Sequence, residues 1–383
     1  MPGETPRIAY FADCFDEVNG VALTTRQFTG YARRRQLPLL LVRAASRPAE
    51  PAGGCLLLRR SRLAVTVDPD LDFDLLFLRH LRRVERAVGE FAPDFIHVTS
   101  PGDVGLLGAL CSHRLGIPLS AAWHTNLHEF GAWRLSRMLS GLPSRVRPSP
   151  GWLQRWLERA ALAFYRRAKV LFAPNPELVT FLERATGRKV HRMIRGVDTS
   201  LFHPGRRRRS DDVLWLGYVG RLMPEKNVRL LARVDEALAR ARVADYHLLI
   251  AGLGRERRWL QSRLPRAEFY GILSPERLAR LYADLDLFLF PSRTDTYGNV
   301  VQEALASGTP VIVTDGGGPK FIVTEGVNAL VARTDGEFIE CVLRAAGDRR
   351  LLERLKAGAR AWQAPSWEAV FEGMYAAWRQ ASK

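Results

Sequence analysis

Short apolar runs alternate along the chain with longer segments in which apolar residues recur every three or four positions. The runs predict buried strands and the longer segments predict helices. The predicted strands lie at 7–12, 38–42, 55–58, 94–99, 118–123, 170–172, 190–194, 214–219, 246–251, 267–270, 285–290 and 309–314. Because strands and helices alternate throughout, the sequence predicts an α/β fold with parallel sheets.

One strand-loop-helix-strand unit carries candidate chemistry. Its first strand is the apolar run at 285–290, its loop occupies 292–299, and its second strand is 309–314. Such a loop lies at the carboxyl ends of the strands, where open α/β sheets bind ligands. Asp295 lies in the loop and Glu303 in the following helix, whose free N–H groups suit a phosphorylated ligand. The alternative is that Asp295 only caps the loop and Glu303 is a solvated helix residue.

Candidate residues also lie in three other loops, each of which follows a predicted strand. The first contains Asn19 and Gly20, and glycine allows close approach of a ligand, although Asn-Gly alone more often marks a turn. Another strand ends at His124, at the ligand edge of its sheet. The pair His124 and His128 with Glu129 could be interpreted as metal ligands, but a helix pattern and a third ligand are lacking, so we expect no metal site.

The loop after the strand at 214–219 reads Gly220-Arg221-Leu222-Met223-Pro224-Glu225-Lys226-Asn227. An Arg and a Lys at a sheet's carboxyl edge can neutralise a departing diphosphate without a metal. An isolated Arg-Lys pair would more often be two solvent-exposed surface residues. Here the pair follows a strand and a glycine at the carboxyl edge of the sheet, and this position favours a phosphate-binding role.

These motifs, in this order, resemble those of the family-4 glycosyltransferases. These enzymes have the GT-B fold and transfer a sugar from a nucleotide donor with retention of configuration. Asp295 stands where the family's acidic motif has its first Glu, Arg195 replaces the usual Asn before Gly196, and Lys320 stands where an acidic residue is common. The segments TDTYGNVVQEALASG and DEVNGVALTT resemble those of bacterial α-mannosyltransferases and related glycolipid glycosyltransferases. This resemblance suggests GDP-mannose as the donor.

The resemblance implies a role for each candidate residue. Arg221 and Lys226 would stabilise the leaving diphosphate, Asp295 and His124 would bind sugar hydroxyls, and Glu303 would bind the ribose. The substrate-binding backbone implied by the family comprises Gly20, Gly271, Leu273, Tyr297, Gly298, Asn299 and Val300. Neither a cofactor nor a metal ion is expected, and the nucleotide sugar is a substrate.

The same resemblance implies two Rossmann-like domains with parallel sheets facing an interdomain cleft. We expect an acceptor-side domain at 1–204, a linker at 205–212 and a nucleotide-sugar-binding domain at 213–362. A terminal helix at 363–383 would pack back on the first domain.

Length and composition agree with this organisation. The chain has 383 residues, of which 47% are hydrophobic and 25% charged, enough for two domains with their own cores. It has no apolar run long enough to span a bilayer and no secretory signal pattern at its start, so we expect a cytoplasmic protein. The four cysteines have no C-x-x-C spacing, which indicates reduced thiols and no disulfide framework or zinc site.

The net charge of +17 would suit nucleic acid, an anionic membrane surface or a phosphorylated substrate. Residues 130–169 interleave Arg and Lys with Trp and Leu, which suggests a membrane-interface or anionic-acceptor surface at the inner membrane face. An ordinary helix pair with a solvated Arg face explains the pattern equally well. The sequence contains no recognisable nucleic-acid-binding module, so we expect no nucleic-acid partner.

The sequence therefore favours a retaining, metal-independent hexosyltransferase acting on a lipid-linked or glycan hydroxyl. Two alternatives remain open at this point. One is a nucleotide-sugar epimerase of similar architecture, and the other is a non-catalytic nucleotide- or membrane-binding protein.

Overall fold

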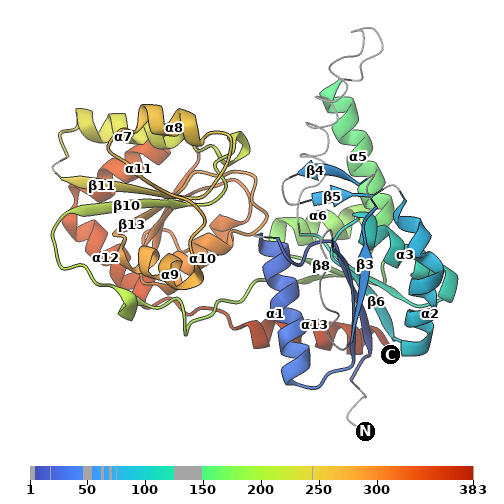
Figure 1. Cartoon of the computed structure of the whole chain (residues 1–383). Coiled ribbons are helices and arrows are strands. Elements are labelled where there is room, and N and C mark those ends of the chain that lie inside the picture. Colours follow the sequence, from blue (N-terminus) through green and yellow to red (C-terminus); the bar gives the residue numbers. More distant parts are fainter. Residues whose placement is uncertain are drawn as a thin grey trace. The chain divides into compact units, whose positions relative to one another are not determined.

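The structure is a computed structural model that describes residues 5–17, 19–45, 54–61, 64–68, 71–74, 76–124, 149–243 and 245–382. The chain divides into two compact units (Figure 1). The first unit comprises Met1–Ile194 and Trp367–Lys383, and the second comprises Arg195–Ser366.

The first unit is built on a seven-stranded parallel sheet with the order β3-β2-β1-β6-β7-β8-β9. Its strands are β1 (Ile8–Ala12), β2 (Leu39–Ala45), β3 (Cys55–Arg59), β6 (Phe95–Val98), β7 (Leu119–Ala122), β8 (Val170–Ala173) and β9 (Val190–Arg192). Its helices are α1 (Gly20–Arg34), α2 (Leu81–Phe91), α3 (Asp103–Leu115), α5 (Pro150–Tyr165), α6 (Pro176–Thr186) and α13 (Trp367–Ser382), with the 3-10 helix η1 (Phe77–His80). A separate antiparallel pair joins β4 (Val65–Asp68) and β5 (Leu71–Phe73).

Successive residues of β1 point to opposite faces of this sheet, as the pleat of a strand requires. Ala9 and Phe11 lie in a core with residues of α2, α3 and α6. Ile8 and Tyr10 lie in a second core with α1 and α13. Trp378 of α13 donates a hydrogen bond from Nε1 to Ser120 Oγ at 2.9 Å. The last helix of the chain therefore completes the first unit.

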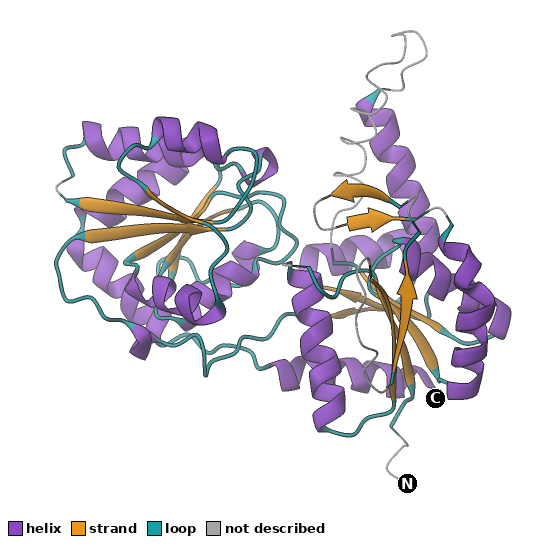
Figure 2. Ribbon diagram, viewed as in Figure 1, coloured by secondary structure: helices purple, strands orange, loops and turns teal. Residues whose placement is uncertain are grey.

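The second unit has a six-stranded parallel sheet with the order β12-β11-β10-β13-β14-β15, which lies between two helical layers (Figure 2). Its strands are β10 (Leu214–Val219), β11 (Tyr246–Ala251), β12 (Glu268–Tyr270), β13 (Leu287–Phe290), β14 (Val311–Thr314) and β15 (Ala329–Ala332). Its helices are α7 (Leu230–Arg240), α8 (Arg257–Arg263), α9 (Pro275–Asp284), α10 (Asn299–Ala306), α11 (Asp335–Gly347) and α12 (Arg349–Arg360), with 3-10 helices η3 (Pro204–Arg206), η4 (Pro224–Lys226) and η5 (Pro319–Phe321).

The strand order of the second unit reverses at β10, which pairs with β11 on one side and β13 on the other. Ligands of open α/β sheets bind beyond the carboxyl ends of the strands at such a reversal. The loops that follow β10 and β13 leave the sheet at this point, and they are the two loops in which the sequence placed Arg221, Lys226 and Asp295.

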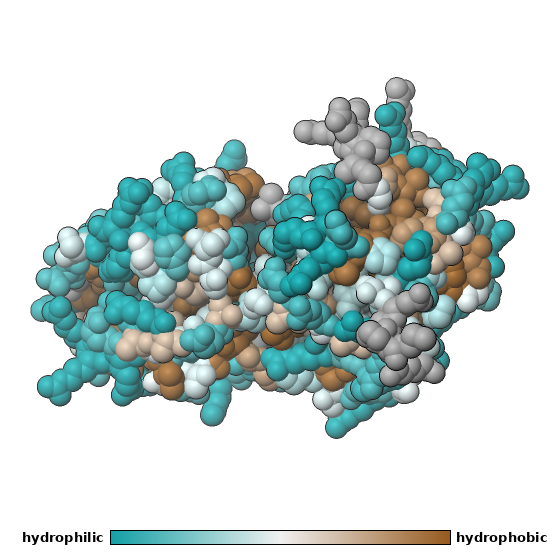
Figure 3. Space-filling view, turned by 90° about the horizontal axis from the view of Figure 1, so that it is seen from below, coloured by the Kyte–Doolittle hydropathy of each residue, from teal (hydrophilic) through white to brown (hydrophobic). Residues whose placement is uncertain are grey.

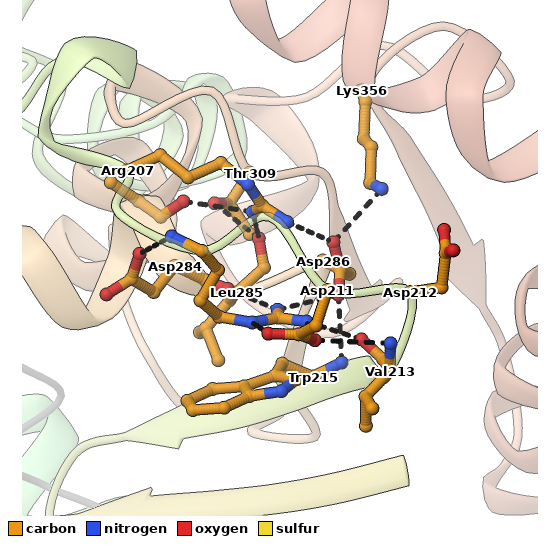
Figure 4. A network of polar contacts seen from close by, with 12 residues as sticks. Arg207, Asp211, Asp212, Val213, Trp215, Asp284, Leu285, Asp286, Thr309 and Lys356 are labelled. Carbon is orange, nitrogen blue, oxygen red and sulfur yellow. Dashed lines mark hydrogen bonds and ion pairs between the residues drawn. The ribbon is translucent and has the colours of Figure 1, made fainter. Parts of the chain in front are cut away.

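Residues 205–212, expected to be a linker, belong to the second unit and are fixed to it. Arg207 and Arg209 both donate hydrogen bonds to the buried carboxylate of Asp286 at 2.9 Å. Lys356 of α12 forms an ion pair with the same carboxylate at 3.0 Å (Figure 4). The boundary between the units lies after Ile194, before the predicted position. Arg207 and Arg209 lie within the second unit and are bound by its acidic residues, so this segment is not a solvated connection.

The predicted fold class, two α/β units with parallel sheets, is confirmed. The predicted strands at 214–219 and 246–251 match β10 and β11 residue for residue. The sequence prediction missed β15 and the β4–β5 pair, which are only three or four residues long. Within the part of the chain that the structure describes, there is no helix both long and apolar enough to cross a membrane.

Candidate active site

The loop after β10 turns sharply to bring Lys226 to the edge of the sheet. Gly220 has φ +151°, and a Cβ at this position would lie 2.8 Å from the hydroxyl of Tyr218. The loop then forms η4 and ends at Asn227, which has the left-handed φ of +53°. Thr294 from the loop after β13 donates a hydrogen bond to Glu225 O at 3.1 Å. The two loops are thus joined to each other directly.

Lys226 and Asp295 form an ion pair, with Nζ 2.7 Å from Oδ1. Side-chain exposure is 11% for the lysine and 23% for the aspartate, so water screens the pair weakly. Burial acts to raise the pKa of Asp295, but the charge and hydrogen bond of Lys226 outweigh it and hold the pKa below its ordinary value. Two residues that the sequence placed in separate roles therefore contact each other.

Arg221 lies in the same loop and is more exposed. Its guanidinium is 3.9 Å from Glu225, an ion pair within the loop itself, and 38% of its side chain is exposed. A partly solvated guanidinium of this kind remains accessible to a phosphate group, for which its geometry is well suited.

The helix α10 begins directly after the loop that follows β13, so the N–H groups of its first turn lie at the end of that loop. Its N-cap is Gly298, with φ +107°, and glycine has no side chain to cap the first N–H groups. A glycine-rich loop after β14 covers this region: Gly318 N donates to Asp295 O at 2.7 Å, and a Cβ on Gly318 would lie 2.1 Å from Thr296 O. Only glycine permits this close approach of two backbones.

Tyr297 is buried, and its ring is fixed within the second unit. The hydroxyl donates to Gln302 Oε1 at 3.0 Å, and Gln302 Nε2 donates to Gly196 O at 3.0 Å. The side chain of Tyr297 therefore anchors the loop. Asn299 and Val300, also expected to bind substrate, are the first two residues of α10 and are partly exposed.

Glu303 lies one turn into α10 and is partly buried. Tyr282 of α9 donates a hydrogen bond from its hydroxyl to Glu303 Oε2 at 3.2 Å. Burial raises the pKa of Glu303 to about 7, and the hydrogen bond from Tyr282 opposes that rise. The sequence did not single out Tyr282, because it stands 21 positions before Glu303 in a helix without a motif.

Gly271 and Leu273 follow β12 at the same edge of the sheet. Leu253, in the loop after β11, lies against Gly271, where an added Cβ would be 4.0 Å from its Cδ2. Leu253 is 51% exposed and Ile272 is 63% exposed. Aliphatic side chains exposed at a ligand edge offer an apolar surface to a planar group. The apolar residue after the Gly252 turn was a sequence signal that could have identified Leu253.

Gly20 and His124 lie in the first unit. Gly20 is the first residue of α1, and the Asn19 side chain caps that helix by accepting from Val21 N at 3.1 Å and Ala22 N at 2.9 Å. His124 is buried at the end of β7. His128, Glu129 and the 130–148 part of the basic aromatic stretch lie outside the described residues.

The first unit also contains a buried carboxylate that the sequence reasoning missed. Asp13, directly after β1, accepts hydrogen bonds from Ser100 Oγ at 2.6 Å and from the N–H groups of Val104 and Gly105 at 3.0 and 3.2 Å. Burial raises the pKa of Asp13 to about 6. Its position after a strand was the available signal. Asp13 occupies the amides that begin α3, so those amides are satisfied within the protein.

No group of three or more His, Cys, Asp or Glu side chains suited to a metal ion is found among the residues described. The described cysteines, Cys14, Cys55, Cys111 and Cys341, are free thiols in the structure.

Two family models match the chain. The model of glycosyltransferase family 4 matches residues 18–201, and the model of glycosyl transferases group 1 matches residues 214–348. The chain is 32% identical over 342 residues to the GDP-mannose-dependent alpha-mannosyltransferase of Mycobacterium tuberculosis, covering 87% of this chain and 85% of the relative. It is 30% identical over 378 residues to the enzyme of the same name from Corynebacterium glutamicum, covering 95% and 86%.

Solved structures show the same fold at low identity. A sucrose-phosphate synthase from Thermosynechococcus elongatus superposes with a TM-score of 0.72 at 18% identity, covering 98% of this chain and 99% of that one. Anabaena HepE in complex with UDP and glucose superposes with a TM-score of 0.69 at 18% identity, covering 96% and 98%. These likenesses confirm the predicted GT-B fold class. The chain belongs to the family-4 glycosyltransferases, and it is a glycosyl-transferring enzyme.

Proposed function

We propose that the enzyme transfers a hexose, with retention of configuration, from a nucleotide sugar to a hydroxyl of a lipid-linked or glycan acceptor. The observation that carries the proposal is the Lys226–Asp295 pair at 2.7 Å, placed at the strand-order reversal beside the start of α10. A lysine, a solvated Arg221 and helix amides at one edge of a sheet suit a diphosphate.

The chemistry follows from where charge develops. When the bond from the sugar to the diphosphate breaks, negative charge gathers on the leaving phosphate. Lys226 and Arg221 stabilise that charge, and the N–H groups from Tyr297 to Val300 add donors. The leaving diphosphate takes the proton of the acceptor hydroxyl, so the mechanism needs no strong protein base. We propose that neither a cofactor nor a divalent metal takes part; full activity in chelator is the expected result.

The remaining site residues bind the donor and the acceptor in this proposal. Glu303 accepts a hydrogen bond from the ribose, and the backbone from Gly271 to Leu273 contacts the nucleobase. Asp295 shares its carboxylate between Lys226 and a hydroxyl of the sugar. His124 contacts the sugar, and the loop at Gly20 faces donor phosphate or acceptor.

The proposed donor is GDP-mannose. Two relatives of this chain are named GDP-mannose-dependent alpha-mannosyltransferases, at 30–32% identity over most of the chain, which supports this choice. The proposed acceptor is lipid-linked, with exposed basic and aromatic residues of α5 as the contact to the membrane surface.

A donor screen tests the proposal. Thermal unfolding is followed with GDP, UDP and ADP and with their sugars, since a ligand that binds the folded state raises the melting temperature by mass action. The largest rise is expected with GDP and GDP-mannose. Lack of stabilisation by any of these nucleotides would contradict the proposal. Release of free sugar from the donor alone, with inverted configuration, would instead indicate epimerase-like chemistry.

A further inference from the structure

Tyr282 is a fully buried residue of α9 whose hydroxyl reaches a residue of the candidate site. The hydroxyl donates to Glu303 Oε2 at 3.2 Å, and no basic side chain among the described residues forms an ion pair with Glu303. A buried tyrosine hydroxyl needs a partner, and a carboxylate that lacks a cation depends on the donors it has.

The surroundings of Tyr282 fix where its hydroxyl lies. The ring packs edge-on against Phe202 and Phe288, with centroids 6.0 and 5.4 Å away. Thr309 Oγ1 donates to the backbone oxygen of Tyr282 at 2.5 Å, which ties α9 to the start of the segment leading into β14. The tyrosine ring is thereby held in one position, and its hydroxyl acts as a fixed donor.

The hydrogen bond has two consequences for Glu303. It occupies Oε2 and so leaves Oε1 as the acceptor for a ligand hydroxyl. It also favours the ionised carboxylate, in a place where burial favours the neutral acid. Glu303 without this bond would be both less ordered and more readily protonated, and a neutral acid is a weaker acceptor.

We propose that Tyr282 is a positioning residue for ribose recognition: it holds the carboxylate of Glu303 so that the second oxygen accepts a hydrogen bond from a ribose hydroxyl of the donor. The proposal rests on the function proposed above, in which Glu303 contacts the ribose. It goes beyond that function because it assigns part of donor affinity to a residue that touches no substrate.

The test compares a nucleotide with its analogue that lacks the ribose hydroxyls. Dissociation constants are measured by calorimetry for GDP and 2′,3′-dideoxy-GDP, with the wild type and Tyr282→Phe, which keeps the ring and removes the hydroxyl. We expect Tyr282→Phe to weaken GDP binding about tenfold, the effect of one hydrogen bond to a charged group, and to leave dideoxy-GDP binding unchanged.

A matched control is available in the same unit. Tyr246 donates to Asp235 Oδ1 at 2.7 Å, a tyrosine–carboxylate bond of the same kind between β11 and α7. Tyr246→Phe should alter neither dissociation constant. Melting temperatures of both variants report on folding, and the ratio of the two dissociation constants cancels any general loss of the folded state.

A second arm tests whether Tyr282 acts through Glu303. In an enzyme carrying Glu303→Gln, the further change Tyr282→Phe should not weaken GDP binding again, because the carboxylate to be positioned is gone. An additive loss, or a parallel loss for GDP and dideoxy-GDP, would overturn the inference.

The outcomes separate this inference from the proposed function. If wild-type enzyme binds none of the nucleoside diphosphates, the proposed function itself fails. If Glu303→Gln weakens GDP binding selectively but Tyr282→Phe does not, the function stands and the positioning role of Tyr282 is wrong.

Discussion

The short side chain of Asp295 has a direct effect on the charge at the diphosphate side of the site. Because the carboxylate lies 2.7 Å from Lys226 Nζ, the lysine is held in one orientation before any substrate binds. A lysine ordered in this way loses little freedom when a phosphate arrives, and such preorganisation is what stabilises charge that develops during a reaction.

Removing Lys226 should therefore lower turnover more than stability. We expect Lys226→Ala to reduce turnover on the order of a hundredfold or more, because the lost charge matters most as the diphosphate departs. The double change Lys226→Ala with Asp295→Asn avoids an unpaired buried carboxylate, so it should recover stability without activity. Lys189→Ala, at an exposed lysine of the first unit, is the control. Near-normal turnover of Lys226→Ala would contradict the assignment.

Glu303 leads to a prediction about pH. Burial raises its pKa from the ordinary 4.5 to about 7, so between these values the folded protein holds a proton that the unfolded chain has released. By linkage, this group makes the free energy of unfolding fall as pH rises through that window, with no further change above it.

The neutral variant Glu303→Gln carries no ionisable group at this position, so it avoids the loss of stability that follows ionisation of the buried carboxyl. It should match the wild type in melting temperature near pH 4.5 and exceed it at pH 8, by up to about 3 kcal/mol in the free energy of unfolding. Glu236→Gln, at an exposed carboxylate of α7, should show no such trend. Equal melting temperatures of Glu303→Gln and the wild type at both pH values would show that the fold does not raise the pKa of Glu303.

Single residues were predictable from the sequence where a motif fixed their place. Arg221, Lys226, Asp295 and Glu303 were found because each stands at a fixed distance from a strand end or from another motif residue. The partners of these residues were not predictable from the sequence. Tyr282 contacts Glu303 only because α9 packs against α10, and the spacing of the two residues in the sequence does not indicate that contact.

At the scale of elements, buried charge rather than apolar periodicity positions the entry into the second unit. The carboxylate of Asp286, just before β13, accepts hydrogen bonds from Arg207, Arg209 and Trp215 N, and it pairs with Lys356. Burial acts to raise the pKa of Asp286, but these donors outweigh it and hold the pKa below its ordinary value. One side chain thus joins an irregular segment, two strands and a helix.

Loss of this carboxylate should destabilise the second unit. Asp286→Asn removes the buried counter-charge of Arg209 and Lys356, which then keep only the half-exposed carboxylates of Asp211 and Glu353. Breaking a buried pair costs about 3 kcal/mol. We expect a melting temperature roughly 5 to 10 °C lower. Asp212→Asn is the matched control, at the neighbouring carboxylate labelled in Figure 4. This carboxylate is 91% exposed and pairs with the exposed Arg349. An unchanged melting temperature for both variants would contradict a stabilising role of the Asp286 network.

Elements were predictable where their apolar period was clear. β10, β11 and the helix after Gly298 follow from local pattern. The segment 205–212 does not, because a run of arginines has the composition of a solvated connection and its acidic partners stand about 75 positions away in the chain.

At the scale of the whole molecule, the net charge of +17 favours binding to an anionic partner. On the face seen in Figure 3, hydrophilic residues cover most of the described surface, with apolar side chains showing between them. Among the exposed apolar residues, Trp152 and Trp156 of α5 are each 52% exposed and stand one helical turn apart. Arg155 and Arg159 are exposed on the same helix. Interfacial helices combine tryptophan and arginine in this way.

We predict that α5 holds the enzyme reversibly at an anionic membrane surface, where the proposed lipid-linked acceptor lies. Each basic residue near such a surface contributes about 1 kcal/mol, and the attraction weakens as salt screens it. Sedimentation with anionic vesicles should recover the wild type at low salt, and much less at high salt or with neutral lipid. Arg155→Glu with Arg159→Glu should reduce recovery severalfold. Arg349→Glu with Arg350→Glu, the same charge change on α12, should reduce it far less. Equal loss with both pairs would mean that overall charge, not α5, causes binding, and equal recovery with neutral lipid would leave α5 as an ordinary packing helix beside a soluble acceptor.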